Sequence, residues 1–321
     1  RKKYFFLFFL PFLSVFCNIQ SMNKVISNEV NHKQYQIIGK HGRQKGQFSN
    51  PQDVLISSNI LLVSDTINQN VQSFSRQTGV HSGTFLFSTI SKQIPLRRPI
   101  GLAQTNEDIC SYLVTDYDQH LISNWRIDEN GNGKLMKKFA QKTLVGPKGI
   151  CVSKQTNNIL VADNKGNQIC LFNSSGELLH RFGSRGTELH QLAGPHYVRF
   201  ADETNDRNIL VTDFYNNTVK IFDLERHGQF VQSLGSHGTT NGYFQAPTGL
   251  AIDYDRGFIF VSDWGNNRIQ IFDHQGTFIR LIDLSTPDML YGPQGLDYDS
   301  ITQTLAIANS GKHSVILTNI I

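Results

Sequence analysis

The chain has 321 residues, of which 39% are hydrophobic and 17% charged, and it carries a net charge of +4. This composition excludes a disordered chain, and so mild a net charge indicates an acidic partner only where the charges gather on one surface. The four cysteines form no Cys-x-x-Cys pair, which argues against a structural zinc site. Cys110, Cys151 and Cys170 lie within apolar runs and are expected to pack as small core residues.

The amino-terminal segment starts with three basic residues, followed by an almost wholly apolar run that ends at Cys17. This pattern is typical of a secretory signal peptide and is short for a membrane span. The residues after it lack a clean small-x-small cleavage site, so a mispredicted start is the alternative. We therefore expect a signal-like or mispredicted segment at residues 1–17, a polar linker at residues 18–32, and no stable membrane span.

From residue 33 onwards the sequence repeats itself. A proline opens each of six units, and successive prolines are 46 to 52 residues apart. An apolar run follows each proline and ends in Asp or, in the last unit, in Asn. The prolines are Pro51, Pro99, Pro147, Pro195, Pro247 and Pro293. The polar residues that end the apolar runs are Asp65, Asp116, Asp163, Asp213, Asp263 and Asn309.

Most units hold four short runs of β-branched and aromatic residues with Gly, Asn or Asp between them. In the third unit these runs include residues 159–163, 169–172 and 178–182. Short strands at this spacing, without helical periodicity, are typical of propeller blades. A single blade has two hydrophobic faces to bury, and stacking six around an axis buries both. The sequence therefore predicts an all-β, six-bladed propeller over residues 33–321.

The two ends of the repeat region are complementary. The last unit stops after its third strand, at residues 315–318, and a spare fourth strand lies at residues 35–42. This spare strand matches residues 179–186 and 231–238, which are fourth strands of other units. We expect the N-terminal strand to complete the last blade, because this pairing removes an open sheet edge.

Residues 242–253 and 261–273 resemble an NHL repeat in every feature. Further segments resemble the NHL propellers of the tripartite-motif family, in particular its neuronal ubiquitin-ligase branch. These segments are residues 133–136, 146–149, 193–196, 263–266 and 290–296. The resemblance implies a cytoplasmic module that selects protein targets or RNA for a RING-type ligase. The sequence contains no RING, B-box, coiled coil or filamin-like domain, so ligase activity is not expected of this chain.

Some residues could belong to an enzyme's active site, but a structural role explains them better. The Asp at each strand end can accept backbone N–H bonds and hold the loop that follows, a role that every blade needs. One NHL-type family, the peptidyl-amidoglycolate lyases, holds zinc with axial His, but only His196 follows a repeat proline here. Its equivalents are Gln52, Ile100, Lys148, Thr248 and Gln294. With no catalytic motif present, we expect no enzyme, metal, cofactor or small-molecule substrate.

Charged loop residues divide between two faces of the predicted propeller. The loops that join blades share one face with the loops between second and third strands. This face is basic: Arg43, Lys45, Lys92, Arg97, Arg98, Lys142, Lys165, Arg185, Arg268 and Lys312. Its acids are chiefly Asp118, Glu188 and Asp288. The opposite face is acidic, with basic residues interspersed, and solubility alone is the plain explanation of both.

Aromatic residues accompany the cations on the basic face: Tyr117, Phe214, Tyr215, Tyr243 and Trp264. Cations with stacking platforms suit single-stranded RNA, and aromatics with Arg also form protein hot spots. We therefore predict a non-catalytic recognition module for a protein target or single-stranded RNA. The alternative is a secreted or cell-surface scaffold, exported through residues 1–17. The predicted binding residues are Arg97, Arg98, Lys148, Arg185, His196, Phe214, Tyr215, Trp264 and Arg268.

Overall fold

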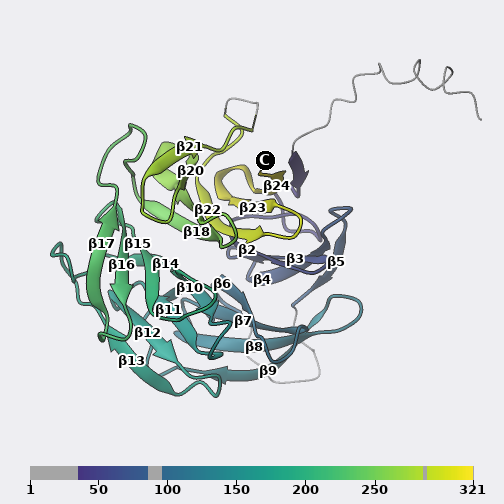
Figure 1. Cartoon of the computed structure of the whole chain (residues 1–321). Helices are drawn as coiled ribbons and strands as arrows, with labels where there is room; N and C mark the ends of the chain where they lie inside the picture. Colours follow the sequence, from purple (N-terminus) through teal and green to yellow (C-terminus); the bar gives the residue numbers. More distant parts are fainter. Residues whose placement is uncertain (1–34, 86–95, 285–287, 321) are drawn as a thin grey trace, which may run out of the picture. The chain divides into compact units, whose positions relative to one another are not determined.

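The computed structural model describes residues 35–85, 96–284 and 288–320. In these ranges the chain forms six four-stranded antiparallel sheets, which stand as blades around a central axis (Figure 1). The predicted six-bladed propeller is confirmed. The signal-like segment and the linker expected at residues 1–32 lie outside the described residues. Within the described ranges, no helix is long and apolar enough to cross a membrane.

The blades follow one another in chain order. In blades 1–5 the strands are numbered from the axis outwards, and in blade 6 the outermost strand is β1. Blade 1 consists of β2 (Pro51–Ser57), β3 (Ile60–Asp65), β4 (Asn70–Ser75) and β5 (His81–Thr84). Blade 2 consists of β6 (Pro99–Gln104), β7 (Ser111–Asp116), β8 (Leu121–Ile127) and β9 (Gly133–Phe139). Blade 3 consists of β10 (Pro147–Val152), β11 (Ile159–Asp163), β12 (Gln168–Phe172) and β13 (Leu178–Phe182).

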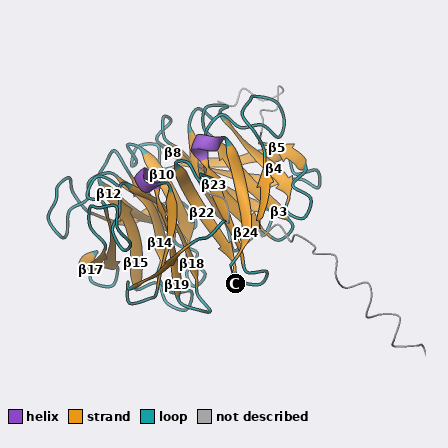
Figure 2. Cartoon of the chain, turned by 90° about the horizontal axis from the view of Figure 1, so that it is seen from above, coloured by secondary structure: helices purple, strands orange, loops and turns teal. Residues whose placement is uncertain are grey.

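The second half of the ring repeats this plan. Blade 4 consists of β14 (Pro195–Phe200), β15 (Asn208–Asp213), β16 (Thr218–Asp223) and β17 (Gln229–Leu234). Blade 5 consists of β18 (Pro247–Asp253), β19 (Phe258–Asp263), β20 (Arg268–Phe272) and β21 (Phe278–Leu281). Blade 6 consists of β22 (Pro293–Asp299), β23 (Thr304–Asn309), β24 (Ser314–Asn319) and β1 (Tyr35–Ile38). Two 3₁₀ turns, η1 (Trp264–Asn266) and η2 (Ser310–Lys312), are the helical segments of the described ranges (Figure 2).

The inner strands explain why Gly recurs two positions after the repeat proline. A Cβ on Gly101 would lie 2.2 Å from the Lys148 carbonyl oxygen of the next blade. A Cβ on Gly249 would lie 2.1 Å from the Gln294 carbonyl oxygen, again in the next blade. At these two positions the neighbouring inner strands approach so closely that only Gly fits between them, whereas Asp53 and Tyr197 occupy the equivalent positions of blades 1 and 4.

The hydrophobic core lies between the blades. One cluster combines Val63 of blade 1 with Ala306 and Leu317 of blade 6, and Ile38 of β1 packs into it at 3% exposure. The pairing of β1 with β24 places Ile38 opposite Val315. The predicted closure of the ring by the N-terminal strand is thus confirmed, and it is stabilised by burial as well as by backbone hydrogen bonds.

The polar residues at the ends of the second strands accept hydrogen bonds from backbone N–H groups, as the sequence predicts. Asp65 accepts the N–H groups of Ser49 and Asn50 at 3.0 and 2.9 Å. The equivalent residue of every other blade accepts at least one N–H group in the same way. These groups precede the blade's proline, so the Asp and Asn side chains hold the loop that enters the blade. The loop that follows is held as well, for example by Asn68, which donates to Asp65.

Candidate binding surface

The top face of the propeller is defined here by the loops that join blades and the loops between second and third strands. Its centre includes the ends of the inner strands. Lys148 on β10 and His196 on β14 each follow their repeat proline, and Lys148 Nζ lies 2.6 Å from His196 Nε2. His196 is 3% exposed and Lys148 is partly buried. The predicted axial residues of two neighbouring blades are therefore in direct contact.

Aromatic rings surround this pair. The Phe214 ring stacks on His196 with a centroid distance of 5.5 Å, and it contacts Tyr215 at 4.9 Å and Trp264 at 6.0 Å. Lys148 Nζ lies 5.9 Å from the ring centroid of Phe214. The same nitrogen lies 5.9 Å from the centroid of Tyr117. We call these six residues the axial cluster: Tyr117, Lys148, His196, Phe214, Tyr215 and Trp264.

Two cations cover the Tyr117 ring. The Arg98 guanidinium lies 4.7 Å from the ring centroid and the Lys165 ammonium 4.6 Å from it. Arg98 also pairs with Asp118 at 3.8 Å, but both side chains are 47% exposed, so this ion pair is weak. The predicted residue Arg98 therefore lies beside the axial cluster with most of its charge uncompensated.

The remaining predicted residues are Arg97, Arg185 and Arg268. Arg97 and Arg185 are exposed on the top face. Arg268 pairs with Asp263 at 2.8 Å and donates to the carbonyl oxygens of Thr240 and Tyr243. Because its guanidinium is bound within its own blade, Arg268 holds a loop in place and we leave it out of the proposed binding surface.

The aromatic residues that the sequence predicts to be exposed differ in their exposure to solvent. Tyr215 is 71% exposed and Trp264 is 41% exposed. Phe214 and Tyr117 are partly buried, because His196 covers one and the two cations cover the other. Tyr215 and Trp264 therefore offer the accessible rings of the cluster.

The electrostatics of the pair follow from its enclosure. Burial, together with the nearby Arg98 guanidinium, lowers the pKa of Lys148 to about 7. Burial, and then the charge of Lys148, lowers the pKa of His196 well below its usual range. The imidazole is therefore neutral near pH 7 and accepts a hydrogen bond from the lysine at Nε2.

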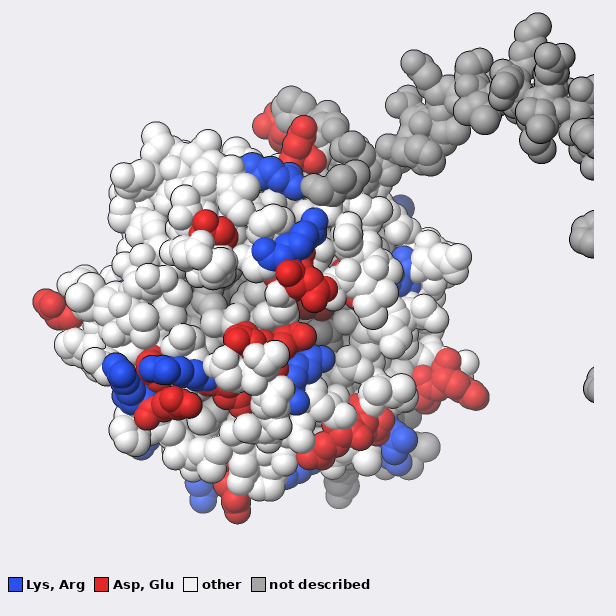
Figure 3. Space-filling view, in the orientation of Figure 1, with Lys and Arg blue, Asp and Glu red and all other residues white. Residues whose placement is uncertain are grey.

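Ion pairing varies among the cations of both faces. On the face opposite the top face, Arg76 pairs with Asp299 at 2.5 Å and Arg256 with Asp253 at 2.5 Å, whereas exposed Lys154 has no ion pair with any described residue. Figure 3 shows basic and acidic side chains lying beside one another on the face it presents. On the top face, the exposed cations that have no ion pair with any described residue include Arg43, Lys45, Arg97, Lys142, Lys165, Arg185 and Lys312.

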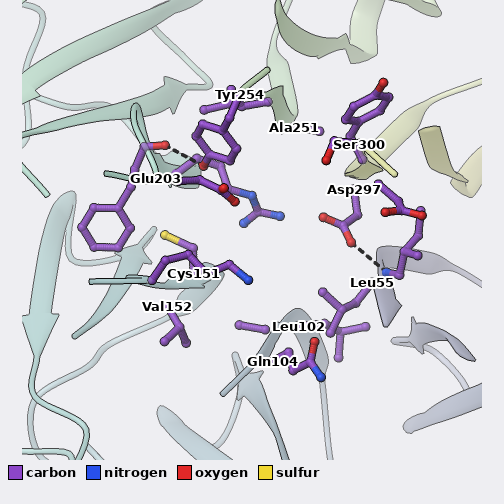
Figure 4. A pocket seen from close by; sticks show the side chains of 18 of the residues that line it. Leu55, Leu102, Gln104, Cys151, Val152, Glu203, Ala251, Tyr254, Asp297 and Ser300 are labelled. Atoms are coloured by element: carbon purple, nitrogen blue, oxygen red, sulfur yellow. Dashed lines mark hydrogen bonds between the residues drawn. The ribbon is translucent and has the colours of Figure 1, made fainter. Parts of the chain in front are cut away.

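A cavity of about 310 Å³ lies on the axis, between the inner strands and the loops of the opposite face (Figure 4). Arg199 on β14 donates to the carbonyl oxygens of Ile150 at 3.0 Å and Leu296 at 3.4 Å. Asp297 accepts the N–H group of Ile56 at 2.7 Å. The bonds of Arg199 connect β14 to β10 and to β22, and the bond of Asp297 connects β22 to β2. The polar residues of the cavity therefore join blades across the axis.

The carboxyl groups near Arg199 have strongly raised pKa values. Burial raises the pKa of Asp53 to about 7 and that of Asp297 to about 6, although Arg199 opposes both shifts. Burial also raises the pKa of the Cys151 thiol to about 11, so this thiol is a poor nucleophile near neutral pH. Sequence analysis missed this group, and its signal was the presence of charged residues within otherwise apolar inner strands.

The described residues contain no group of three or more His, Cys, Asp or Glu that could hold a metal ion. The strand-end carboxylates are occupied by the backbone hydrogen bonds given above.

Parts of this chain resemble an NHL-repeat family model and two described proteins. A family model for the NHL repeat matches residues 244–272. The chain is 32% identical to Protein brain tumor of Drosophila melanogaster over 41% of this chain and 12% of that protein. It is 26% identical to the human E3 ubiquitin-protein ligase NHLRC1 over 51% of this chain and 39% of that protein. The matches thus span well under two thirds of each relative, and they confirm the resemblance to NHL-repeat propellers of the tripartite-motif type.

Solved structures share the fold at low sequence identity. Virginiamycin B lyase from Staphylococcus aureus superimposes with a TM-score of 0.58 and 12% identity, covering 89% of this chain and all of that chain. Kuenenia stuttgartiensis hydrazine synthase superimposes with a TM-score of 0.60 and 13% identity, covering 87% of this chain and 98% of that chain. At such identities the likeness shows the propeller fold alone.

Proposed function

We propose that this propeller is a non-catalytic recognition module that binds a protein partner through its top face. The observation that carries the proposal is the axial cluster, in which Tyr215 and Trp264 present exposed rings beside a partly charged core. Aromatic residues at the centre of a surface, with charged residues around them, have the composition of a protein hot spot. The unpaired cations at the rim suit an acidic partner.

A protein partner fits the cluster better than a nucleic acid does. Two of its rings, Phe214 and Tyr117, are already covered by His196 and by the neighbouring cations, which leaves few free platforms for successive bases. The central lysine is only partly charged near pH 7 and is a weak phosphate anchor. The E3 ubiquitin-protein ligase among the relatives agrees with target selection as a role of this type of propeller.

Single-stranded RNA is the second candidate, and a specific observation favours it. Arg97, Lys142 and Arg185 are exposed cations without an ion pair in the described part of the chain. Cations of this kind neutralise phosphates and give binding that weakens steeply with salt.

Photo-crosslinking distinguishes these two partners. A photoreactive amino acid is placed at position 215 or 264, and a control is placed at Met136, which is 54% exposed on the outer strand β9. We expect protease-sensitive adducts from the two top-face positions and none from the control. Adducts that ribonuclease removes would support RNA instead, and equal adducts from all three positions would contradict a top-face site.

Charge reversal tests the RNA candidate quantitatively. Replacing Arg97 and Arg98 with Glu is compared with replacing Lys134 and Arg181, which are exposed on outer strands. If RNA is the partner, the first pair weakens binding of a uridine oligonucleotide and flattens its salt dependence, and the second pair does not. The RNA candidate fails if binding is weaker than about micromolar at physiological salt or if both pairs behave alike.

A further inference from the structure

Two enclosed lysines of the propeller have different partners. Lys220 Nζ lies 3.1 Å from the Asp213 carboxylate and donates to the carbonyl oxygens of Glu188 and Gln191. Lys148 Nζ has His196 Nε2 as its hydrogen-bond partner, and no described carboxylate lies within ion-pair distance of it. Lys220 is therefore stabilised as an ammonium ion, whereas Lys148 is surrounded by groups that do not stabilise its charge.

The groups that face Lys148 come from the two neighbouring blades, 2 and 4. Tyr117 and Phe214 place their rings 5.9 Å from Nζ. The charged and titratable groups beside it are Arg98, Tyr117 and His196, and Asp118 and Lys165 contact Arg98 and Tyr117 respectively. The acid in this set, Asp118, is engaged with Arg98 at 3.8 Å. The amine therefore lies among aromatic rings, a neutral imidazole and a guanidinium.

This environment favours the neutral amine. Burial and then Arg98 lower the pKa of Lys148 to about 7. His196 accepts at Nε2 and so carries its own hydrogen at Nδ1, which has no hydrogen-bond partner among the described residues. One Lys148 hydrogen points at the imidazole, and the nitrogen lone pair is free. A lysine that is neutral in a desolvated pocket beside another cation is an activated nucleophile.

We propose that Lys148 is a carbonyl-reactive amine that forms an imine with aldehydes reaching the centre of the top face. The Nζ lone pair attacks the carbonyl carbon, and a C–N bond forms as the C=O π bond breaks. Nζ then loses two protons in turn, and His196 Nε2 relays each to the former carbonyl oxygen. The first proton converts the alkoxide to a hydroxyl group, and the second lets that oxygen leave as water as the C=N bond forms. One amine and one aldehyde thus give one imine and one water, with no oxidant or reductant. This reactivity goes beyond recognition of a protein partner and does not depend on it.

The surroundings indicate the class of aldehyde. Rings of Tyr117 and Phe214 lie beside the amine, Trp264 contacts Phe214, and these rings favour an aromatic aldehyde. Arg98 and Lys165 flank the same site and favour an anionic substituent on that aldehyde. Pyridoxal 5′-phosphate has both features and serves as the probe, and pyridoxal lacks the anionic group.

The experiment measures imine formation on the folded chain. The protein is incubated with pyridoxal 5′-phosphate, reduced with borohydride to fix the imine, and analysed by peptide mass spectrometry. At pH 7 we expect Lys148 to be labelled at least about tenfold faster than exposed Lys165 and Lys142, because an ordinary lysine is less than about 0.1% neutral there. The labelling rate of Lys148 should reach half its maximum near pH 7.

Variants and a second probe make the result specific. K148R should abolish labelling of its own peptide and leave the other lysines unchanged, and H196F should slow labelling of Lys148 in a chain whose melting curve shows that it is folded. Pyridoxal should label Lys148 more slowly than its phosphate ester. Labelling of Lys148 no faster than that of Lys165, or a rate that still rises between pH 8 and 10, would overturn the proposal. Equal rates with the two probes would overturn the anionic class of ligand.

Discussion

At the scale of the residue, one polar side chain in each blade fixes the path of the chain. Asp116 is fully buried and accepts the N–H groups of Arg97 and Arg98 at 2.7 and 3.2 Å and that of Gln119 at 3.1 Å. Those backbone donors lie where the chain turns and no strand can pair them. A short acidic side chain is therefore a structural requirement, because unpaired buried N–H groups are costly.

Replacing Asp116 with Ala tests this role. The change leaves several backbone donors without a partner, so the free energy of unfolding should fall by about 3 kcal/mol. Asp118 lies two residues on in the same loop, where its side chain is 47% exposed, and Asp118→Ala should change stability by less than about 0.5 kcal/mol. Chemical denaturation of both variants measures the difference. Equal losses would show that loop charge, and not the hydrogen bonds, sets the stability.

The axial carboxylates give the fold a specific pH dependence. Burial raises the folded-state pKa of Asp297 to about 6, above the unfolded value of 3.8. Between these two values the folded chain binds more protons than the unfolded chain, so this group makes stability fall as pH rises from about 4 to about 6. Asp53, with a pKa of about 7, extends the fall towards neutral pH.

Replacing Asp297 with Asn removes one of these titrations. The amide oxygen can still accept the Ile56 N–H group, so the variant should fold. Its stability should fall less steeply than that of the wild type between pH 4 and 6, and the two slopes should agree above pH 7. Denaturation midpoints across this range provide the measurement. Parallel curves at every pH would mean that Asp297 is ionised throughout.

The sequence predicts which residues lie at the centre of the top face, but it does not predict which of their side chains are in contact. The position after each repeat proline indicates that Lys148 and His196 face the axis, and the structure places them there. Which of the six axial side chains meet depends on their rotamers and on neighbouring blades, which no repeat pattern specifies. The burial of Phe214 is of the same kind, because it results from stacking on a residue of its own blade's inner strand.

At the scale of the element, the N-terminal strand contributes one residue to the core. Ile38 is 3% exposed and packs between blades 1 and 6, whereas its neighbour Ile37 is 52% exposed. Side chains of a strand alternate between its faces, so adjacent residues of identical chemistry have opposite environments. The pair is a built-in control for the contribution of ring closure.

Ile38→Ala should lower the free energy of unfolding by about 3 kcal/mol, because it leaves a cavity at the closing interface. Ile37→Ala should have an effect below about 0.5 kcal/mol. Truncation gives the same comparison: removal of residues 1–32 should leave the melting temperature unchanged, and removal of residues 1–38 should lower it. Equal melting temperatures for the two truncations would contradict closure by this strand.

The inter-blade loops show a pairing of aromatic and small residues that sequence analysis did not use. A Cβ on Gly146 would lie 3.0 Å from the Tyr117 ring of the preceding blade. A Cβ on Gly292 would lie 3.1 Å from the indole nitrogen of Trp264, also in the preceding blade. The residue before the repeat proline is therefore small where an aromatic side chain lies over it. This correlation between blades was present in the sequence and becomes interpretable once the blades are placed side by side.

At the scale of the whole molecule, the number of blades and the closure were predictable because they follow from a repeat and its interruption. The distribution of effective charge over the two faces could not be predicted from the sequence. Sequence assigns cations to both faces, but Arg76 and Arg256 are neutralised by adjacent carboxylates, whereas Arg97 and Lys142 are not. Pairing depends on side-chain positions across neighbouring loops, so counting charges by face does not give the distribution of effective charge.

This asymmetry predicts how a partner associates with the top face. Unpaired cations at the rim attract an acidic partner at long range and so raise the association rate, whereas buried aromatic contacts form late and set the dissociation rate. Replacing Arg97 and Arg98 with Glu should therefore lower the association rate on the order of tenfold at low salt, with a smaller effect at high salt. Replacing Trp264 with Ala should leave association nearly unchanged and weaken binding by about 2 kcal/mol through faster dissociation.

Surface plasmon resonance with a captured crosslinking partner separates these two effects. The wild type and both variants are measured at several salt concentrations, with Lys134 and Arg181 replaced by Glu as the control of equal charge change. The control variant should keep the wild-type association rate, because its residues lie on the outer strands β9 and β13. If the control slows association as much as the top-face variant does, attraction reflects the net charge of the molecule and not the asymmetry of its faces.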